Sequence, residues 1–262
     1  MSVEQEAINW YKKKLKSEPN LNNPVSYNDK IQWLKIYDQD PDIVTCCDKI
    51  LVKEYVANII GNKYIIPNTT DYPAVWKTNH GSGGIQFINS KQDEATALEK
   101  LQPMLKKTYG KNKGEWAYRL ITPGIIKEKR INNNDVDYKF HCCNGEVKWL
   151  QMIWDRYSGK TKESNIDPDG NPMNWWFDEK MQHVEELPHC GLDKFFELKK
   201  LAETLSRKWK YVRVDLYYGE DQPWFGELTF WPKAGCYKTT DQLKFGKLLD
   251  FDLTTTKPKV VE

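Results

Sequence analysis

The sequence predicts an α+β protein in which a mainly helical beginning is followed by two groups of strands. Apolar residues recur at helical spacing through roughly the first 60 positions, whereas alternation and hairpin turns dominate the second half. The 262 residues suffice for one large domain or two small ones with a buried core. The formal net charge of +2 gives no argument for a nucleic-acid surface or a polybasic membrane patch.

Six cysteines occur without C-x-x-C spacing, so neither a zinc ribbon nor a thioredoxin-like site is predicted. The adjacent pairs Cys46-Cys47 and Cys142-Cys143 suit packing better than bridging. The N-terminus is charged and amphipathic, and no apolar run approaches the length of a membrane span. We therefore expect a reduced, cytoplasmic protein with no membrane span and no nucleic-acid partner, whose oligomeric state the sequence does not indicate.

Helices are expected first. Residues 3–17 carry apolar residues at helical spacing, and "EPNLNNP" ends that helix. Ser26 with Asp29 resembles a capping box ahead of "KIQWLKIYD". Asp40-Pro41 predicts the start of a helix that runs to Gly61 and carries Lys49.

From residue 63 the pattern changes to strands. "KYIIP", "AVWKTN" and "IQFINS" are read as strands, and "GIIKEKRI" as another. Between the last two, Ser90 is expected to cap a helix through "DEATALEKLQPMLKK", kinked or divided by Pro103. A further helix is predicted over about residues 193–209.

Asn144-Gly145 is the strongest hairpin signal in the chain. A two-residue loop pairs Cys143 with Glu146, and alternation then assigns the faces. One mostly apolar face would hold Tyr138, Phe140, Cys142, Val147, Trp149 and Gln151. The more polar face would hold Asp137, Lys139, His141, Lys148, Leu150 and Met152, and His141 would be a surface or groove residue rather than a metal ligand.

The second hairpin is "YVRVDLYYGEDQPWFGELTFW". If its loop centres on Asp221, Asp215 lies opposite Glu227 and Arg213 opposite Thr229, all on one face. Two carboxylates that face each other in apolar strands need a cation or a shared proton. Mg²⁺ fits, because it takes oxygen ligands and completes its shell with water and phosphates. The alternative is that both merely bond to Arg213 or a nearby lysine.

"WKTNHGSGG" places three glycines and a serine after the strand-end Lys77. Glycines let backbone N–H groups approach a phosphate closely. The stretch lacks the G-x-x-x-x-G-K-[ST] pattern of a P-loop, and a strand rather than a helix follows it. By itself, the segment is most often only a flexible turn. Lys49 and His80 are likewise read as ordinary helix and loop residues when each is taken alone.

In their order along the chain, these pieces resemble the ATP-grasp enzymes: "DK", "WKTNHGSGG", "IIKEKRI", "DYKF", "VRVDLY" and "GELTFWPKAG". More narrowly, the chain resembles the ATP-grasp family associated with teichuronopeptide and cell-surface polysaccharide biosynthesis. "NPVSYNDKIQWLKIYDQDP", "DYKFHCCNGEVKWLQ" and "VRVDLYY…FGELTF" carry this likeness, which spans about residues 20–250. The resemblance implies two α+β lobes around a nucleotide cleft.

The resemblance also implies roles for individual positions. Phosphate contacts of ATP would come from Lys49, Lys77, Lys139 and the loop His80, Gly81, Ser82, Gly83 and Gly84. Adenine and ribose would be held by Glu128, Lys129, Arg130, Ile131 and Asp135. The metal ligands would be Asp215 and Glu227, with Thr229 where many relatives have Asn. Arg213, Lys139 and His80 would be catalytic.

The expected organisation is a helical segment (1–62), a small lobe with the glycine-rich loop (63–120) and a large lobe with the metal site (121–262). The usual Rossmann-like N-terminal domain is absent, so the acceptor site is not assigned. The leading hypothesis is a ligase that uses Mg²⁺ and ATP to join a carboxylate, of a uronic acid or an amino acid, to an amine through an acyl-phosphate. The partners are then ATP and a carbohydrate or amino-acid acceptor.

Two alternatives stay open. A kinase of a sugar or glycan hydroxyl would need the same nucleotide site. The other alternative is a glycosyltransferase or a non-catalytic glycan-binding module. A transferase could use Asp215 and Glu227 for a metal–nucleotide-sugar complex. Its usual aspartate-x-aspartate motif occurs at Asp135/Asp137 and Asp167/Asp169, both weak signals in turn-like contexts. Trp175 and Trp176 are candidates for stacking on sugar faces, or equally for core packing.

Overall fold

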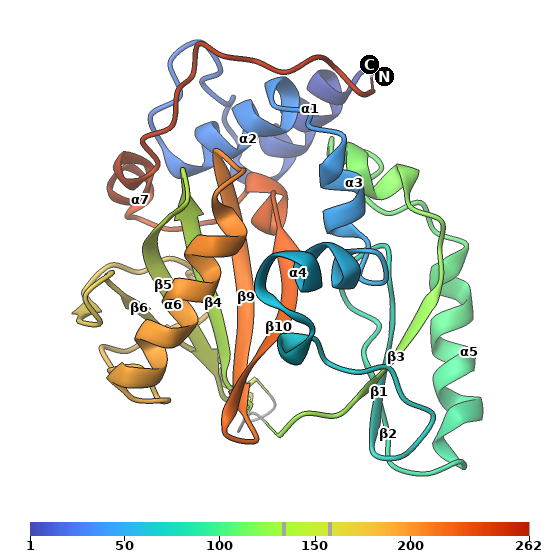
Figure 1. Cartoon of the computed structure of the whole chain (residues 1–262). Coiled ribbons are helices and arrows are strands. Elements are labelled where there is room, and N and C mark those ends of the chain that lie inside the picture. The colour runs from blue at the N-terminus through green and yellow to red at the C-terminus, as the bar shows by residue number, and fades with distance from the viewer. Residues whose placement is uncertain (133–134, 157–158, 262) are drawn as a thin grey trace.

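The computed structural model describes residues 1–132, 135–156 and 159–261, and it contains two sheets (Figure 1). The helices are α1 (Val3–Leu15), α2 (Tyr27–Tyr37), α3 (Asp42–Cys47), α4 (Val52–Ile60), α5 (Asp93–Leu105), α6 (Leu192–Ser206) and α7 (Gln242–Leu248), with 3-10 turns η1 (Asn62–Tyr64), η2 (Trp116–Leu120) and η3 (Pro232–Gly235). The strands are β1 (Ala74–Thr78), β2 (Gln86–Ile88), β3 (Ile125–Lys129), β4 (Asp137–Cys143), β5 (Glu146–Trp154), β6 (Lys162–Ile166), β7 (Pro172–Met173), β8 (Gln182–His183), β9 (Tyr211–Gly219) and β10 (Gln222–Thr229).

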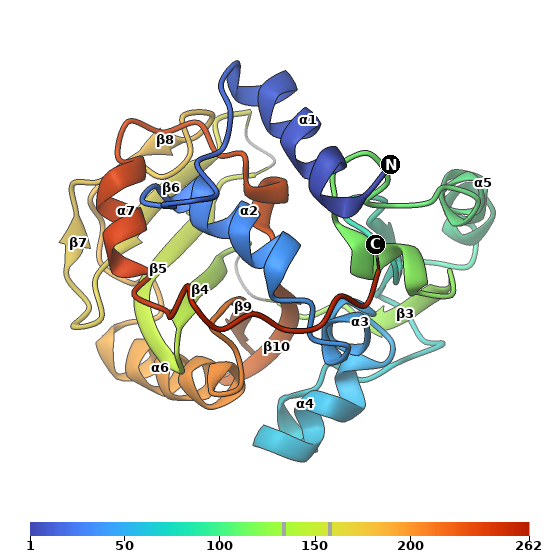
Figure 2. The same ribbon diagram turned by 90° about the horizontal axis from the view of Figure 1, so that it is seen from above.

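The N-terminal helices pack onto the larger sheet. Ser26 caps α2 by accepting the Asp29 N–H at 3.1 Å, and its hydroxyl donates to the Asp29 carboxylate at 2.7 Å, as the capping-box pattern predicts. Helix α2 carries Tyr27 into an aromatic core, where its ring meets those of His141, Trp149, Phe177, Tyr211 and Tyr237 edge-on. Seen from above, α2 and α7 lie over the large sheet, and α1 lies beside α2 at one side of that sheet (Figure 2).

The helix expected from Asp40-Pro41 to Gly61 is interrupted. Helix α3 ends at Cys47 and α4 begins at Val52, so Lys49 lies in a turn and not on a helix. The Asp48 carboxylate accepts the N–H of Ile50 at 2.8 Å and stabilises this turn. "KYIIP" is likewise no strand: it forms η1 and the isolated bridge of Ile65 with Phe225.

The small sheet has the order β2-β1-β3, with all neighbours antiparallel. Helix α5 packs beside it and buries Ala97 and Leu101 against Ala74, Trp76 and Ile88. Pro103 lies inside α5 without ending it, and the N-cap is Gln92 rather than the expected Ser90. Because β3 pairs with β1, this sheet extends beyond residue 120, where the sequence suggested that the small lobe ends.

The large sheet has the order β10-β9-β4-β5-β6-β7, with β8 beside β6. Helix α6 covers one face, where Phe195 lies 6.1 Å from Phe140 between ring centroids. The first hairpin starts in the expected register, with Cys143 opposite Glu146 and Cys142 opposite Val147. A β-bulge then omits Lys148 and pairs His141 with Trp149. Consequently Trp149 and Gln151 lie on the face of His141 and Lys139, opposite to the prediction.

All six cysteines are free thiols, in agreement with the reduced state expected from their spacing. Burial raises the pKa of the Cys46 thiol to about 12, so it stays protonated and packs as a small apolar side chain. Within the described ranges, no helix combines the length and apolar character needed to cross a bilayer.

Candidate active site

Polar side chains form a row across four strands of the large sheet, on the face not covered by α6. Lys139 on β4 lies opposite Gln151 on one side and Asp215 on the other, and Asp215 lies opposite Glu227. The adjacent row consists of Trp149, His141, Arg213 and Thr229. Side chains at neighbouring strand positions lie about 4.5–5.5 Å apart at Cβ. The sheet therefore brings the expected metal carboxylates and their cations to one place.

The predicted pairing of Asp215 with Glu227 is present, although its cause differs from the one assumed. The turn consists of two residues, Glu220 and Asp221, both with positive φ, and Gly219 pairs with Gln222. This turn alone would place Gly226 opposite Asp215. A bulge at Gly226 shifts the register by one and brings Glu227 into line. A Cβ at Gly226 would lie 2.9 Å from both the Asp215 carbonyl and the Tyr217 ring, so the bulge requires glycine.

The two carboxylates are bound by cations of the chain itself. Arg213 donates to both oxygens of Asp215, at 2.6 and 2.7 Å, and to Glu227 at 3.2 Å. Lys139 donates to Asp215, and the Lys49 ammonium lies 3.7 Å from Glu227. Burial by itself would raise the pKa of Glu227, but Lys49, Arg213 and Lys139 together lower it to about 2. The carboxylate is therefore ionised at any physiological pH.

This donor set fits a magnesium ion that is partly coordinated by a substrate. No group of three His, Cys, Asp or Glu side chains that could hold a metal exists in the described part of the chain. Mg²⁺ needs only one or two carboxylates when phosphates and water supply the remaining oxygens. Thr229 donates to Glu227 at 3.2 Å and accepts from Arg213 at 3.1 Å, so its hydroxyl orients Glu227 in this arrangement.

Across from the large sheet, a buried triad positions Lys77 at the end of β1. Glu128 on β3 accepts from Lys77 at 2.6 Å through one oxygen and from Lys53 at 2.7 Å through the other. Lys53, on α4, also donates to the Ile66 carbonyl and to Asn68, each at 2.7 Å. Burial raises the pKa of Glu128, but the two lysines outweigh it and lower that pKa below its ordinary value.

The glycine-rich loop is tied to Lys49 rather than to Lys77. The Lys49 ammonium donates to the Gly81 carbonyl at 2.6 Å, and its backbone N–H donates to Asn79 at 3.2 Å. Asn79 in turn bonds to Asp48, Thr122 and Gly124 at 2.7–3.0 Å. A Cβ at Gly81 would lie 2.6 Å from the Tyr109 ring. The loop therefore starts from a rigid base and passes close over Tyr109.

A cavity of about 960 Å³ lies between the two sheets and the loop. This volume is at the upper end of the range typical for small-molecule sites, and we call this space the nucleotide-sized cavity. Its lining includes most of the expected residues: Lys49, Lys77, Gly81, Ser82, Gly83, Glu128, Lys129, Arg130, Ile131, Asp135, Lys139, Asp215 and Glu227. The N–H groups of Lys129 and Arg130 already donate to Pro67 and Pro73, at 3.0 and 3.2 Å. If this segment contacts adenine, the contacts would have to come from backbone atoms other than these two N–H groups.

Two of the residues expected to contact the phosphates of ATP lie outside this cavity. His80 is buried, and its Nε2 lies 3.2 Å from the Lys107 carbonyl. Gly84, with φ of +66°, packs against Met104 of α5. The structure thus brings neither His80 nor Gly84 to this cavity. Through its contact with Lys107, His80 instead holds the glycine-rich loop against the chain that follows α5.

A second cavity, of about 560 Å³, adjoins the first on the Arg213 side. Both cavities are lined by Lys49, Gly81, Ser82, Lys139, Arg156 and Glu227, while Arg213 and Thr229 line only the second. Nine lysines and arginines surround it, compared with three acidic residues. Tyr109, Tyr118 and Trp231 add aromatic surface. This second space, which we call the basic cavity, therefore suits an anionic ligand.

The remaining expectations are resolved by burial and position. His141 is fully buried instead of lining a groove, and its ring stacks on Trp149 at 4.0 Å. Burial holds the pKa of His141 well below its ordinary value, so it is a neutral core residue. Asp137 pairs with Lys139 and Arg156 at the nucleotide-sized cavity, whereas Asp167 accepts the N–H groups of Asp169 and Asn171 in an exposed turn. Trp175 packs on Phe245, and Trp176 is partly exposed.

Lys53, Asn79 and Gln151 are among the site residues that were not predicted from the sequence. Lys53 and Asn79 act through other residues, and only the folded chain brings their partners together. Gln151 lines the second cavity, and its Oε1 is buried without a hydrogen-bond partner in the described residues. Simple alternation assigned Gln151 to the opposite face, because the bulge at Lys148 has no sequence signal as strong as Asn144-Gly145.

Known families and structures share this architecture. The profile of the family described as TupA-like ATPgrasp matches residues 29–250. An L-amino acid ligase from Bacillus licheniformis has a TM-score of 0.52 at 12% identity, over 86% of this chain and 55% of that one. A D-alanine–D-alanine ligase from Helicobacter pylori has a TM-score of 0.49 at 13% identity, over 88% and 68%.

The chain thus spans little more than half the length of the first of these structures, and that likeness concerns the fold. Among curated proteins, none matches the sequence.

Proposed function

Because this chain belongs to the TupA-like ATP-grasp family, we propose that it is an ATP- and Mg²⁺-dependent carboxylate–amine ligase. One observation carries the proposal: the nucleotide-sized cavity and the basic cavity meet at Lys49, Lys139 and Glu227. A transfer between two substrates requires two binding cavities that meet at the reacting atoms. The phosphoryl group would be transferred from ATP to the acceptor at this boundary.

In this proposal the cations of the cleft neutralise the phosphates of ATP. Lys77 approaches from the small sheet, Lys49 from the turn between α3 and α4, and Lys139 from the large sheet. Asp215 and Glu227 would hold Mg²⁺, which polarises the transferring phosphoryl group when bound. Phosphoryl transfer needs mainly positioning and charge neutralisation, and these side chains supply both. The segment from Glu128 to Ile131 would contact adenine, and Asp135 would contact the ribose.

The proposed reaction has two steps. A carboxylate oxygen of the acceptor attacks the γ-phosphorus of ATP, the bond to the bridging oxygen breaks, and ADP leaves. An amine nitrogen then attacks the acyl carbon, inorganic phosphate leaves, and the amine loses a proton. Arg213 lies on the acceptor side of the boundary, where its guanidinium would stabilise the negative charge that develops on the acyl-phosphate. Closure of the glycine-rich loop would exclude water from that intermediate.

For the acceptor, we propose a uronic acid or amino-acid carboxylate that is modified in cell-surface polysaccharide biosynthesis in the cytoplasm. The excess of basic residues around the second cavity supports an anionic acceptor. The resemblance of the sequence to enzymes of teichuronopeptide biosynthesis supports the pathway.

The acyl-phosphate gives the sharpest test. Protein, ATP, Mg²⁺ and candidate uronic or amino acids are incubated with hydroxylamine, which converts an acyl-phosphate into a stable hydroxamate whatever the natural amine is. We expect ADP and hydroxamate in equal amounts with the protein, and neither with Glu227→Gln. A stable phosphorylated sugar without hydroxamate would instead make the protein a kinase. Failure of ATP to bind at all would exclude both reactions.

A further inference from the structure

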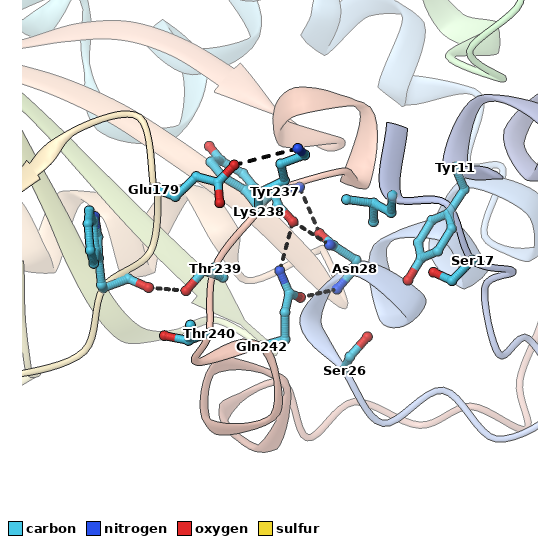
Figure 3. Close-up of a pocket in the computed structure, with 12 residues that line it drawn as sticks. Tyr11, Ser17, Ser26, Asn28, Glu179, Tyr237, Lys238, Thr239, Thr240 and Gln242 are labelled. Carbon is cyan, nitrogen blue, oxygen red and sulfur yellow. Dashed lines mark hydrogen bonds and ion pairs between the residues drawn. The ribbon is translucent and has the colours of Figure 1, made fainter. Parts of the chain in front are cut away.

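Figure 3 shows a third cavity, of about 600 Å³. It is enclosed by α1 and the start of α2 on one side, and by residues 176–179 and 237–242 on the other. Tyr237 and Lys238 line both this cavity and the basic cavity, so the two are neighbours. The Lys238 side chain is 56% exposed and stands at the rim between them.

The lining of this cavity differs in charge from that of its neighbour. Six lining residues carry hydroxyl groups: Tyr11, Ser17, Ser26, Tyr237, Thr239 and Thr240. Its two charged residues, Glu179 and Lys238, have opposite signs and lie 3.7 Å apart. The basic cavity, by contrast, has nine cationic and three anionic residues. A lining without net charge and rich in hydroxyl and amide groups favours an uncharged ligand with many hydroxyl groups.

The walls of the cavity are fixed before any ligand binds. Asn28 donates to the Tyr237 carbonyl at 2.7 Å and accepts the Tyr237 N–H at 3.0 Å, and Gln242 accepts the Asn28 N–H at 3.1 Å (Figure 3). The hydroxyls of Ser17 and Thr240 have no hydrogen-bond partner among the described residues and are available to a ligand. A preformed wall lowers the entropy cost of binding.

Trp176 supplies an aromatic surface at the same place. The residue is 40% exposed, and its indole N–H donates to the carbonyls of Asp178 and Met181, at 2.8 and 3.1 Å. Its backbone N–H donates to Asp241 at 2.9 Å, so both the ring and the main chain are held in place. A rigid, partly exposed indole among hydroxyl and amide groups can pack on the apolar face of a pyranose ring.

We propose that this third cavity binds a neutral sugar unit of an extended glycan acceptor, whose reacting carboxylate occupies the adjacent basic cavity. This inference rests on the proposed function for the position of the reacting end. The sugar-binding step itself needs neither ATP nor turnover, so it can be measured separately.

The first experiment measures binding of neutral tetrasaccharides (cellotetraose, maltotetraose, mannotetraose and xylotetraose) without ATP, by saturation-transfer NMR and tryptophan fluorescence. At least one should bind. Trp176→Ala should weaken that binding about tenfold, equivalent to about 1.4 kcal/mol. Thr240→Trp, which fills the cavity from an exposed position, should weaken it similarly. Phe196→Ala is the matched control, because Phe196 is an exposed aromatic residue on α6 outside all three cavities.

The outcomes separate this inference from the proposed function. Absence of binding by all four sugars, or equal losses in Trp176→Ala and Phe196→Ala, overturns the sugar site even if the ligase is active. Binding of a glutamate tetrapeptide that depends on Trp176 also overturns it, because the ligand would then be a peptide. If ligation occurs, Trp176→Ala should raise KM for an oligomeric acceptor about tenfold and leave KM for ATP and for a monomeric acceptor unchanged. Sugar binding without any ligation would leave the site standing and refute the ligase.

Discussion

The Lys53–Glu128–Lys77 triad predicts a large loss of stability when Lys53 is replaced by Met. The substitution keeps an unbranched side chain and removes the ammonium group. That group makes three contacts of 2.7 Å, to Glu128, to the Ile66 carbonyl and to Asn68. The Lys53 and Glu128 side chains are 15% and 7% exposed, so water cannot readily replace the lost partner. Among the residues that the structure describes, Glu128 would then keep its ion pair with Lys77 alone.

The expected loss follows from these contacts. Hydrogen bonds that involve a charged group contribute about 1.5–3 kcal/mol, and a buried carbonyl left without a donor costs about 1 kcal/mol or more. Part of this is offset, because burial lowers the pKa of Lys53 and Met carries no charge to desolvate. We therefore expect a net loss of about 2–3 kcal/mol in the free energy of unfolding. In a protein of this size that corresponds to a fall in Tm of about 4–10 °C.

Urea denaturation followed by tryptophan fluorescence measures this loss. Lys129→Met is the matched control, since Lys129 contacts Glu220 at the same 2.7 Å but the two side chains are 46% and 35% exposed. An exposed pair should contribute no more than about 1 kcal/mol. Combining Lys53→Met with Glu128→Gln gives a double-mutant cycle, whose coupling should exceed about 1 kcal/mol. Equal losses in Lys53→Met and Lys129→Met, or a coupling near zero, would refute the reasoning.

Three further predictions concern the carboxylate pair. Asp215→Asn and Glu227→Gln should each abolish ATP turnover while circular dichroism shows an intact fold; activity retained in both variants would remove them from the metal site. Asp215→Asn should unfold at lower urea than Glu227→Gln, because Asp215 is more deeply buried and lies closer to its two cationic partners than Glu227 does. The pKa of Glu227 is lowered from its ordinary 4.5 to about 2, so its ionised form stabilises the fold above pH 4.5, and this contribution is lost as the pH falls towards 2. In urea titrations, the difference in unfolding free energy between the protein and Glu227→Gln should therefore shrink between pH 4.5 and pH 2. Above pH 4.5 the difference should stay constant. Gly226→Ala should cost about 1–3 kcal/mol and reduce ADP release, because its Cβ would lie 2.9 Å from the Asp215 carbonyl; a variant with unchanged Tm and turnover would show that the bulge tolerates a side chain.

Local signals predicted the helical and strand segments that carry strong patterns. The Ser26–Asp29 cap and the Asn144-Gly145 turn lie where short-range chemistry dictates them. The ATP-grasp fold, expected from the order of short motifs, is confirmed by the family match over residues 29–250. The interruption at Lys49 was missed, because the helical pattern continues through a turn that Asp48 and Asn79 stabilise from outside the segment.

The two bulges show what a period of two cannot predict. An extra residue at Lys148 moved Trp149 and Gln151 to the face opposite to the one expected. An extra residue at Gly226 produced the expected pairing of Asp215 with Glu227 from a turn one residue shorter than assumed. Packing between strands determines both bulges. Only the bulge at Gly226 has a signal in the sequence, which is the glycine itself. The third cavity was also beyond prediction, because its walls come from three distant parts of the chain.

The cluster around Arg213 has a consequence for the order of binding. Each carboxylate that would hold a metal already has a cationic partner from the chain, and Lys77, the strand-end lysine expected to contact phosphate, already has a carboxylate partner. In the proposed site, binding would therefore be an exchange of partners: phosphates would draw Lys49 and Lys139 away from Glu227 and Asp215, and the two carboxylates, left with Arg213, would take up a metal ion in place of the lysines. Nucleotide and metal should each raise the affinity for the other by the same factor, since such coupling is reciprocal. Magnesium alone would have to compete with the lysines and Arg213, so bound nucleotide would be what raises the affinity of the site for its metal.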